Sequence, residues 1–96
     1  MSRTSRFKFR LFVAGKAPNS AAAIANLGAL CRAHLADRCE IELVDVFREP
    51  KRALAEGVFM TPTLLALSPN STCRIVGTLS DAQTVLLALG LDAVVP

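Results

Sequence analysis

Three cysteines and one histidine are the residues of this chain whose types and spacing could most readily do chemistry. Cys31, Cys39 and Cys73 are odd in number, and no pair has the two-residue spacing of a redox or zinc motif. His34 lies three residues after Cys31, so the two could share a helix face, but two ligands alone make a poor metal site. We therefore predict no metal and no cofactor, and interpret all four residues as core or surface filling.

Two further groups could support acid–base or nucleophilic chemistry. Glu40 and Glu42 point to one face of an expected strand, but a catalytic carboxylate pair needs burial and two different environments. We interpret them as a solvated strand face. In residues 16–20 the only nucleophile is Ser20, with no base near it in sequence. No catalytic residue is therefore predicted.

Length and composition indicate one domain over residues 1–96, with residues 1–6 as a flexible basic arm and 91–96 as a tail. No apolar run approaches the ~20 residues of a membrane helix, and no long apolar segment follows the basic start. We expect a cytoplasmic protein without a membrane partner. Four of the eleven basic residues lie in the first ten positions, but the interleaved aromatics of an RNA-binding sheet are absent. We expect no nucleic-acid partner.

The elements that would position these residues can be read from periodicity and turn chemistry. Alternation predicts strands over 7–13 and 40–46, and further strands over 63–67 and 73–77. A long helix should begin near Pro18, capped by Asn19 or Ser20, and reach about residue 35 with Ile24, Leu27, Cys31 and Leu35 inward. A short helix should begin at Pro50 and end at Gly57. A capping box over 80–83 should start the last helix, which ends at Gly90.

A proline stands directly before an apolar strand in Thr61-Pro62-Thr63, where it cannot donate a ladder hydrogen bond. A cis bond at Pro62 would resolve this conflict. Proteins with a thioredoxin-like fold carry such a proline, and redox thioredoxins also carry Cys-x-x-Cys where this chain has residues 16–19, which contain no sulfur. We predict an α/β, thioredoxin-like fold of order βαβαββα with a four-stranded mixed sheet.

Several blocks, in order, resemble the KaiB family of circadian-clock proteins over roughly residues 7–91. Residues 11–15 and 18–20 resemble the family's Leu-Tyr-Val-Ala-Gly and Pro-Asn-Ser, and 44–46 with Pro50 resemble its Asp-Val and Asn-Pro segment. Residues 61–64 match its Thr-Pro-Thr-Leu, and 74–81 resemble its Arg-Ile-Ile-Gly-Asp-Leu-Ser-Asp. The family's acidic C-terminal tail is missing, and the short helix here is less acidic.

The resemblance implies a non-enzymatic regulator that binds a KaiC-like ATPase and modulates its phosphorylation cycle or signalling output. A related thioredoxin-like domain implies an alternative, an adaptor or sensor module for a histidine kinase, and a thioredoxin-like enzyme is a third reading. Homo-oligomers, dimeric or tetrameric, are also implied. The expected partner-binding residues lie in and around the short helix: Asp45, Arg48, Lys51, Arg52, Ala55, Glu56 and Phe59.

The resemblance also implies two folds, with an oligomeric resting form of order βαββααβ as the alternative. Ala88 and Gly90 stand where the family has Gly and Asp, in a segment that is strand in the resting form and helix in the other. Alanine exceeds glycine in a helix interior by about 1 kcal/mol. We therefore expect the thioredoxin-like form to dominate in the free protein.

Overall fold

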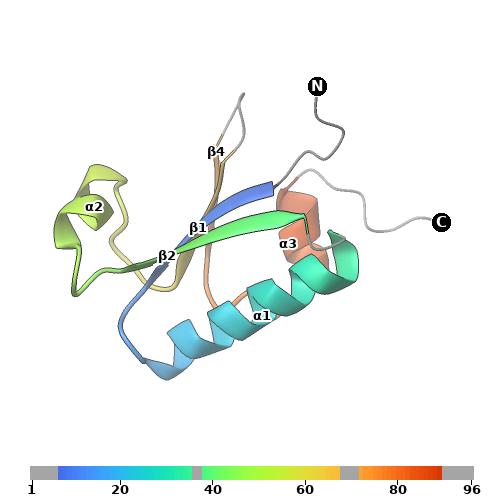
Figure 1. Cartoon of the computed structure of the whole chain (residues 1–96), viewed down its shortest axis with the longest axis horizontal. Coiled ribbons are helices and arrows are strands. Elements are labelled where there is room, and N and C mark those ends of the chain that lie inside the picture. Colours follow the sequence, from blue (N-terminus) through green and yellow to red (C-terminus); the bar gives the residue numbers. More distant parts are fainter. Residues whose placement is uncertain (1–6, 36–37, 68–71, 90–96) are drawn as a thin grey trace.

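The computed structural model describes residues 7–35, 38–67 and 72–89. Within these residues, seven elements follow in the order β-α-β-α-β-β-α, which confirms the prediction (Figure 1). The predicted arm (1–6), the connection over 68–71, the helix stop at Gly90 and the tail (91–96) lie outside the described residues. The elements are β1 (Phe7–Val13), α1 (Pro18–His34), β2 (Cys39–Asp45), α2 (Pro50–Ala55), β3 (Thr63–Leu67), β4 (Thr72–Val76) and α3 (Ala82–Ala88).

The described strands form one mixed four-stranded sheet in the order β2-β1-β3-β4. β1 and β2 are parallel, in a register that runs from Phe7 opposite Cys39 to Val13 opposite Asp45. Parallel neighbours need a long crossover, and α1 provides it. β3 is antiparallel to both β1 and β4. β2 and β4 are therefore the edges of the sheet.

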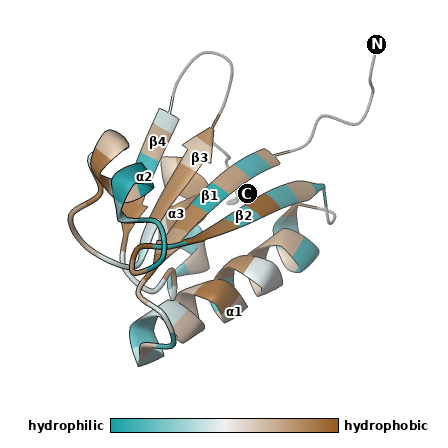
Figure 2. Ribbon diagram, turned by 60° about the vertical axis from the view of Figure 1, so that its left-hand side comes forward, coloured by the Kyte–Doolittle hydropathy of each residue, from teal (hydrophilic) through white to brown (hydrophobic). Residues whose placement is uncertain are grey.

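Helices cover both faces of the sheet. Neighbouring residues of a strand point to opposite faces, so the strands contribute side chains to two cores. Leu11 and Leu64 belong to the larger core, which α1 and α3 close. Phe12 and Val44 belong to a smaller core, into which α2 inserts Ala53. Figure 2 shows hydrophobic colour along β3, whereas α2 carries a hydrophilic segment. No described helix is long and apolar enough to cross a membrane.

The predicted cap of α1 is wrong, although its extent is right. The helix begins at Pro18, and neither Asn19 nor Ser20 caps it with a side chain. The Ser20 hydroxyl is buried and accepts a hydrogen bond from the Ala14 N–H at 3.0 Å, so it fastens the preceding loop instead. Of the residues predicted to face inward, Ile24 is 39% exposed. Its part of α1 lies beside an edge strand, where little covers it.

The last helix also begins differently from the prediction. The carboxylate of Asp81, rather than Ser80, is the cap, and it accepts from the Thr84 N–H at 3.3 Å and from Thr84 Oγ1 at 2.8 Å. These hydrogen bonds lower the pKa of Asp81. The observed cap lies one residue after the predicted Ser80. Ala88 is the last residue of α3 and is exposed.

The interpretation of the cysteines as filling residues is wrong for two of the three. Cys31 and Cys39 form a disulfide, with 6.3 Å between their Cα atoms. Cys73 is a free thiol, and its sulfur lies 3.2 Å from the Ala88 carbonyl oxygen. The pairing was missed because a separation of eight residues matches no short motif, and only the return of the chain from α1 into β2 brings the two sulfurs together.

Candidate partner-binding surface

The segment around α2 is short, and both of its ends are set by residue type. Pro50 occupies the first turn, where its missing N–H costs nothing. Gly57 ends it with a φ of +71°, a value that side chains with a Cβ disfavour. A helix of six residues is marginal alone, so its packing must hold it. Ala53 and Val58 supply that packing within the smaller core.

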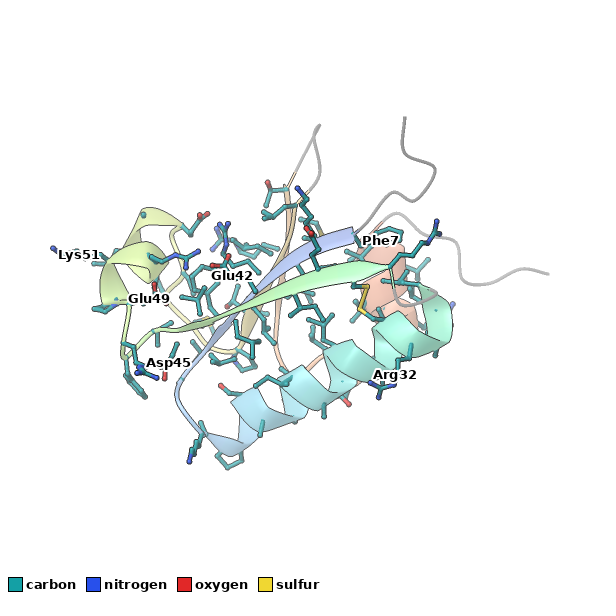
Figure 3. The ribbon with its side chains drawn as sticks, viewed as in Figure 1. Phe7, Arg32, Glu42, Asp45, Glu49 and Lys51 are labelled. Atoms are coloured by element: carbon teal, nitrogen blue, oxygen red, sulfur yellow. A yellow bond between two sulfur atoms is a disulfide. The ribbon has the colours of Figure 1, made fainter. Side chains whose placement is uncertain are left out.

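Glu42 on β2 joins α2 to the sheet through two ion pairs. Its carboxylate accepts from Arg10 Nε at 2.9 Å and from Arg52 Nη1 at 2.8 Å. Arg10 continues the network to Glu56 at 2.8 Å, and Arg52 also approaches Glu49 at 3.5 Å. Glu42 is exposed, as predicted for a solvated strand face, but it also lies between two guanidinium groups, which the sequence did not indicate. Figure 3 shows Glu42 between the sheet and α2.

The network changes the acidity of its central carboxylate. Hydrogen bonding by Arg52, and then by Arg10, lowers the pKa of Glu42 from 4.5 to about 2. The side chain is 47% exposed, so water screens part of this attraction. Glu42 therefore stays ionised through the physiological range and holds both guanidinium groups in place.

Arg74 forms a second link between the sheet and the end of α2, which the sequence did not indicate. This β4 residue donates to the Gly57 and Glu56 carbonyl oxygens, each at 2.7 Å. Carbonyl groups at a helix C-terminus lack intrahelical hydrogen-bond donors and carry partial negative charge. A guanidinium group supplies both the donors and the compensating positive charge. No local pattern connects β4 with α2, because the contact depends on the arrangement of the whole sheet.

Asp45, predicted as a partner contact, has an internal role in this structure. Its Oδ1 accepts from the Gly15 N–H at 3.2 Å and from the Phe47 N–H at 2.9 Å. Gly15 has a φ of +54°, so the loop after β1 is turned sharply where Asp45 holds it. Asp45 therefore fixes the two loops that flank the C-terminal ends of β1 and β2. Direct contact with a partner stays a prediction.

The remaining predicted residues divide into a paired set and an outward set. Arg52 and Glu56 are half-buried in the ion network, whereas Arg48, Lys51 and the other outward residues are exposed. Figure 3 shows Lys51 directed away from the sheet. Neither Arg48 nor Lys51 has an ion pair with any other residue that the structure describes. The outward set is Arg48, Lys51, Ala55 and Phe59.

Large apolar side chains accompany these cations, and most of them were missed from the sequence. Phe59 is 82% exposed and Met60 63%, beside the Thr61–Pro62 peptide bond, which is cis as the sequence suggested. Phe47, which precedes α2, is 75% exposed, and Leu54, within α2, is 66% exposed. Exposed aromatic and methionine side chains next to arginine and lysine are typical of protein interfaces. We call this surface, made of residues 47–60, the α2 surface.

The chemistry of a redox thioredoxin is absent from the corresponding loop. Residues 14–19 contain no cysteine, and the hydroxyl of Ser20 is 1% exposed and already accepts a hydrogen bond. Among the described residues, no group of three or more histidine, cysteine or acidic side chains could hold a metal ion. The fold and the site together define a thioredoxin-like α/β protein with an exposed cationic and apolar surface on a short helix.

Comparison with known proteins gives the family. The KaiB domain model matches residues 10–91. The chain is 39% identical over 90 residues to the circadian clock protein KaiB3 of Synechocystis sp., covering 94% of this chain and 86% of that protein. It is 34% identical over 91 residues to the circadian clock oscillator protein KaiB of Prochlorococcus marinus, covering 95% and 76%. The chain belongs to the KaiB domain family.

Solved structures confirm the thioredoxin-like fold. The N-terminal domain of Synechococcus elongatus SasA superposes with a TM-score of 0.76 at 19% identity, covering 100% of this chain and 94% of that one. Fasciola hepatica thioredoxin gives 0.68 at 18% identity, covering 85% and 79%. At these identities the likeness shows the fold alone. The βαββααβ alternative is not the arrangement of this structure, because residues 82–88 are helical.

Proposed function

We propose that this chain is a non-enzymatic clock regulator of the KaiB type, which docks on a KaiC-like ATPase in the cytoplasm and modulates its phosphorylation cycle or signalling output. The observation that carries the proposal is the family match over residues 10–91 together with the exposed α2 surface. The matched relatives are named as circadian clock proteins. The loop without cysteine and the buried Ser20 support a binding role over an enzymatic one.

Docking should use the outward residues of the α2 surface. Phe59 and Met60 offer apolar area that is lost from water on binding, and Arg48 and Lys51 offer charge for an acidic patch on the partner. Glu42 and Arg74 hold α2 in one orientation, so less conformational entropy is lost when a partner binds.

Charge reversal tests this surface directly. The double variant Arg48→Glu, Lys51→Glu should weaken binding to a KaiC-like ATPase on the order of tenfold, because attraction becomes repulsion. The double variant Arg32→Glu, Arg38→Glu is the matched control, since Arg32 is an exposed cation on α1, away from α2 (Figure 3), and Arg38 is an exposed cation before β2. Binding of the wild type should also weaken as salt rises from low to physiological strength. Equal affinities of the double variant and the control would reject the α2 surface as the docking site.

A second candidate function is an adaptor or sensor module for a histidine kinase. The N-terminal domain of SasA superposes on the full length of this chain. This likeness concerns the fold, and it supports the adaptor or sensor function as an alternative. Parallel pull-downs with a KaiC-like ATPase and with a histidine kinase separate the two proposals. Retention of the kinase alone would select the second. Light scattering of the free chain tests the proposed dimer or tetramer.

A further inference from the structure

The disulfide joins the last turn of α1 to the first residue of β2. Cys31 is 4% exposed and lies in the larger core, whereas Cys39 is partly buried and packs against that core. Figure 3 shows the sulfur–sulfur bond bridging the helix and the start of the strand. The bond therefore fixes one end of an edge strand to the helical layer.

Few other contacts tie β2 to that layer. Ile41 and Leu43 are 41% and 48% exposed, and they line a groove of 470 Å³ together with Ile24 and Leu27 of α1. Val44 is the only buried residue of β2, and it packs in the smaller core with α2. On the α1 side, the disulfide therefore holds β2 against the helical layer, as apolar packing holds the central strands.

The bond opens by thiol–disulfide exchange with a dithiol reductant, and Cys39 is the less buried of its two cysteines. A thiolate of the reductant attacks one sulfur of the bond, forms a mixed disulfide with it, and expels the other sulfur, which takes up a proton. The second thiol of the reductant then attacks the reductant sulfur in that mixed disulfide, which releases the second cysteine and the oxidised reductant. Two electrons and two protons pass to the protein.

We propose that the Cys31–Cys39 disulfide is a redox-responsive tether of the edge strand, opened by dithiol reductants and closed by thiol oxidants or disulfides. Opening frees the first half of β2, up to the ion-pair residue Glu42, from α1. The tether is not a catalytic dithiol, because Cys31 lies at the C-terminal end of its helix, where the dipole disfavours a thiolate. Regulatory disulfides with this kind of control are known from reducing compartments.

Thiol counting and amide exchange on the folded full-length chain test the tether. In air-oxidised protein, a maleimide added in denaturant should modify one thiol, Cys73, and it should modify three when the folded protein has first been treated with dithiothreitol and the reductant removed. The β2 amides of residues 40–42 that donate to β1 should then exchange with deuterium about tenfold faster or more. The amides of Leu64 and Leu65 in central β3 should stay within about twofold.

Two variants separate the tether from other effects of reductant. Cys73→Ala should keep the full response, and Cys39→Ala should exchange like reduced wild type and ignore dithiothreitol. Three reactive thiols in the air-oxidised chain, a bond that dithiothreitol leaves intact in the folded state, or equal β2 exchange in both redox states would each overturn the proposal. These measurements need no partner, so their outcome is independent of the proposed docking function.

Discussion

Replacing Glu42 by glutamine removes the charge that holds Arg10 and Arg52 between the sheet and α2. The side chain keeps its shape but loses two ion pairs of 2.9 and 2.8 Å. Because the carboxylate is 47% exposed, each pair contributes as a surface pair does, well below what the pKa shift alone would suggest. Arg10 also retains Glu56, which offsets part of the loss. We expect the free energy of unfolding to fall by about 0.5–1 kcal/mol at neutral pH.

The pH dependence of this loss follows from the depressed pKa. Glu42 has a pKa of about 2 in the folded chain and an ordinary value of 4.5 when unfolded. Its contribution is fully present above pH 4.5 and is lost as the pH falls toward about 2, since the unfolded state then binds the proton first. The difference between wild type and Glu42→Gln should therefore be constant above pH 5 and shrink steadily below pH 4.5.

Urea unfolding at a series of pH values measures both effects. Glu40→Gln is the matched control, because Glu40 is an exposed glutamate two residues earlier on the same strand and has no ion pair with another described residue. The control should change stability by less than about 0.3 kcal/mol. Equal losses for the two variants, or a difference for Glu42→Gln that stays constant down to pH 2.5, would refute the reasoning.

Three further predictions concern the last helix, the fold population and the chemistry. Asp81→Ala should lower the melting temperature, because Thr84 loses the acceptor of its N–H, whereas Ser80→Ala should not; similar losses in both would contradict the observed cap. Ala88→Gly should cost up to about 1 kcal/mol of helix stability, and should therefore shift any equilibrium with an oligomeric resting form toward that form by up to about fivefold. Light scattering measures this shift, and Ala29→Gly, at an exposed position of α1, is the control that should leave the equilibrium unchanged. The protein should reduce insulin disulfides no faster than background, and activity lost on replacing Cys31, Cys39 or Cys73 by serine would contradict this.

Much of the fold could be predicted because its signals are local. Alternation in Phe7–Val13, the long apolar stripe of α1 and the proline before β3 each report on a few neighbouring residues. Such periodicities reflect which side of an element is buried, so they survive in any arrangement of the elements. The ordered blocks shared with the KaiB family also lie in the sequence itself.

The candidate site was predicted less completely. The sequence placed the site around the short helix, and the resemblance to the KaiB family indicated its basic residues. It did not indicate that Arg52 and Glu56 are paired internally, or that Asp45 holds the loops beside the site. Nor did it indicate the exposed Met60, because an apolar residue beside a turn is expected to be buried.

By itself, the sequence determined the order of the elements, the cis proline position, the absence of sulfur in the loop before α1 and the family. The tertiary structure alone decided which distant groups meet. Glu42 joins β1 to α2, Arg74 joins β4 to the end of α2, and Cys31 joins α1 to Cys39. Each of these contacts depends on strand order, register and helix placement together. A local pattern records the burial of one element, whereas a contact between elements exists only once the chain has packed.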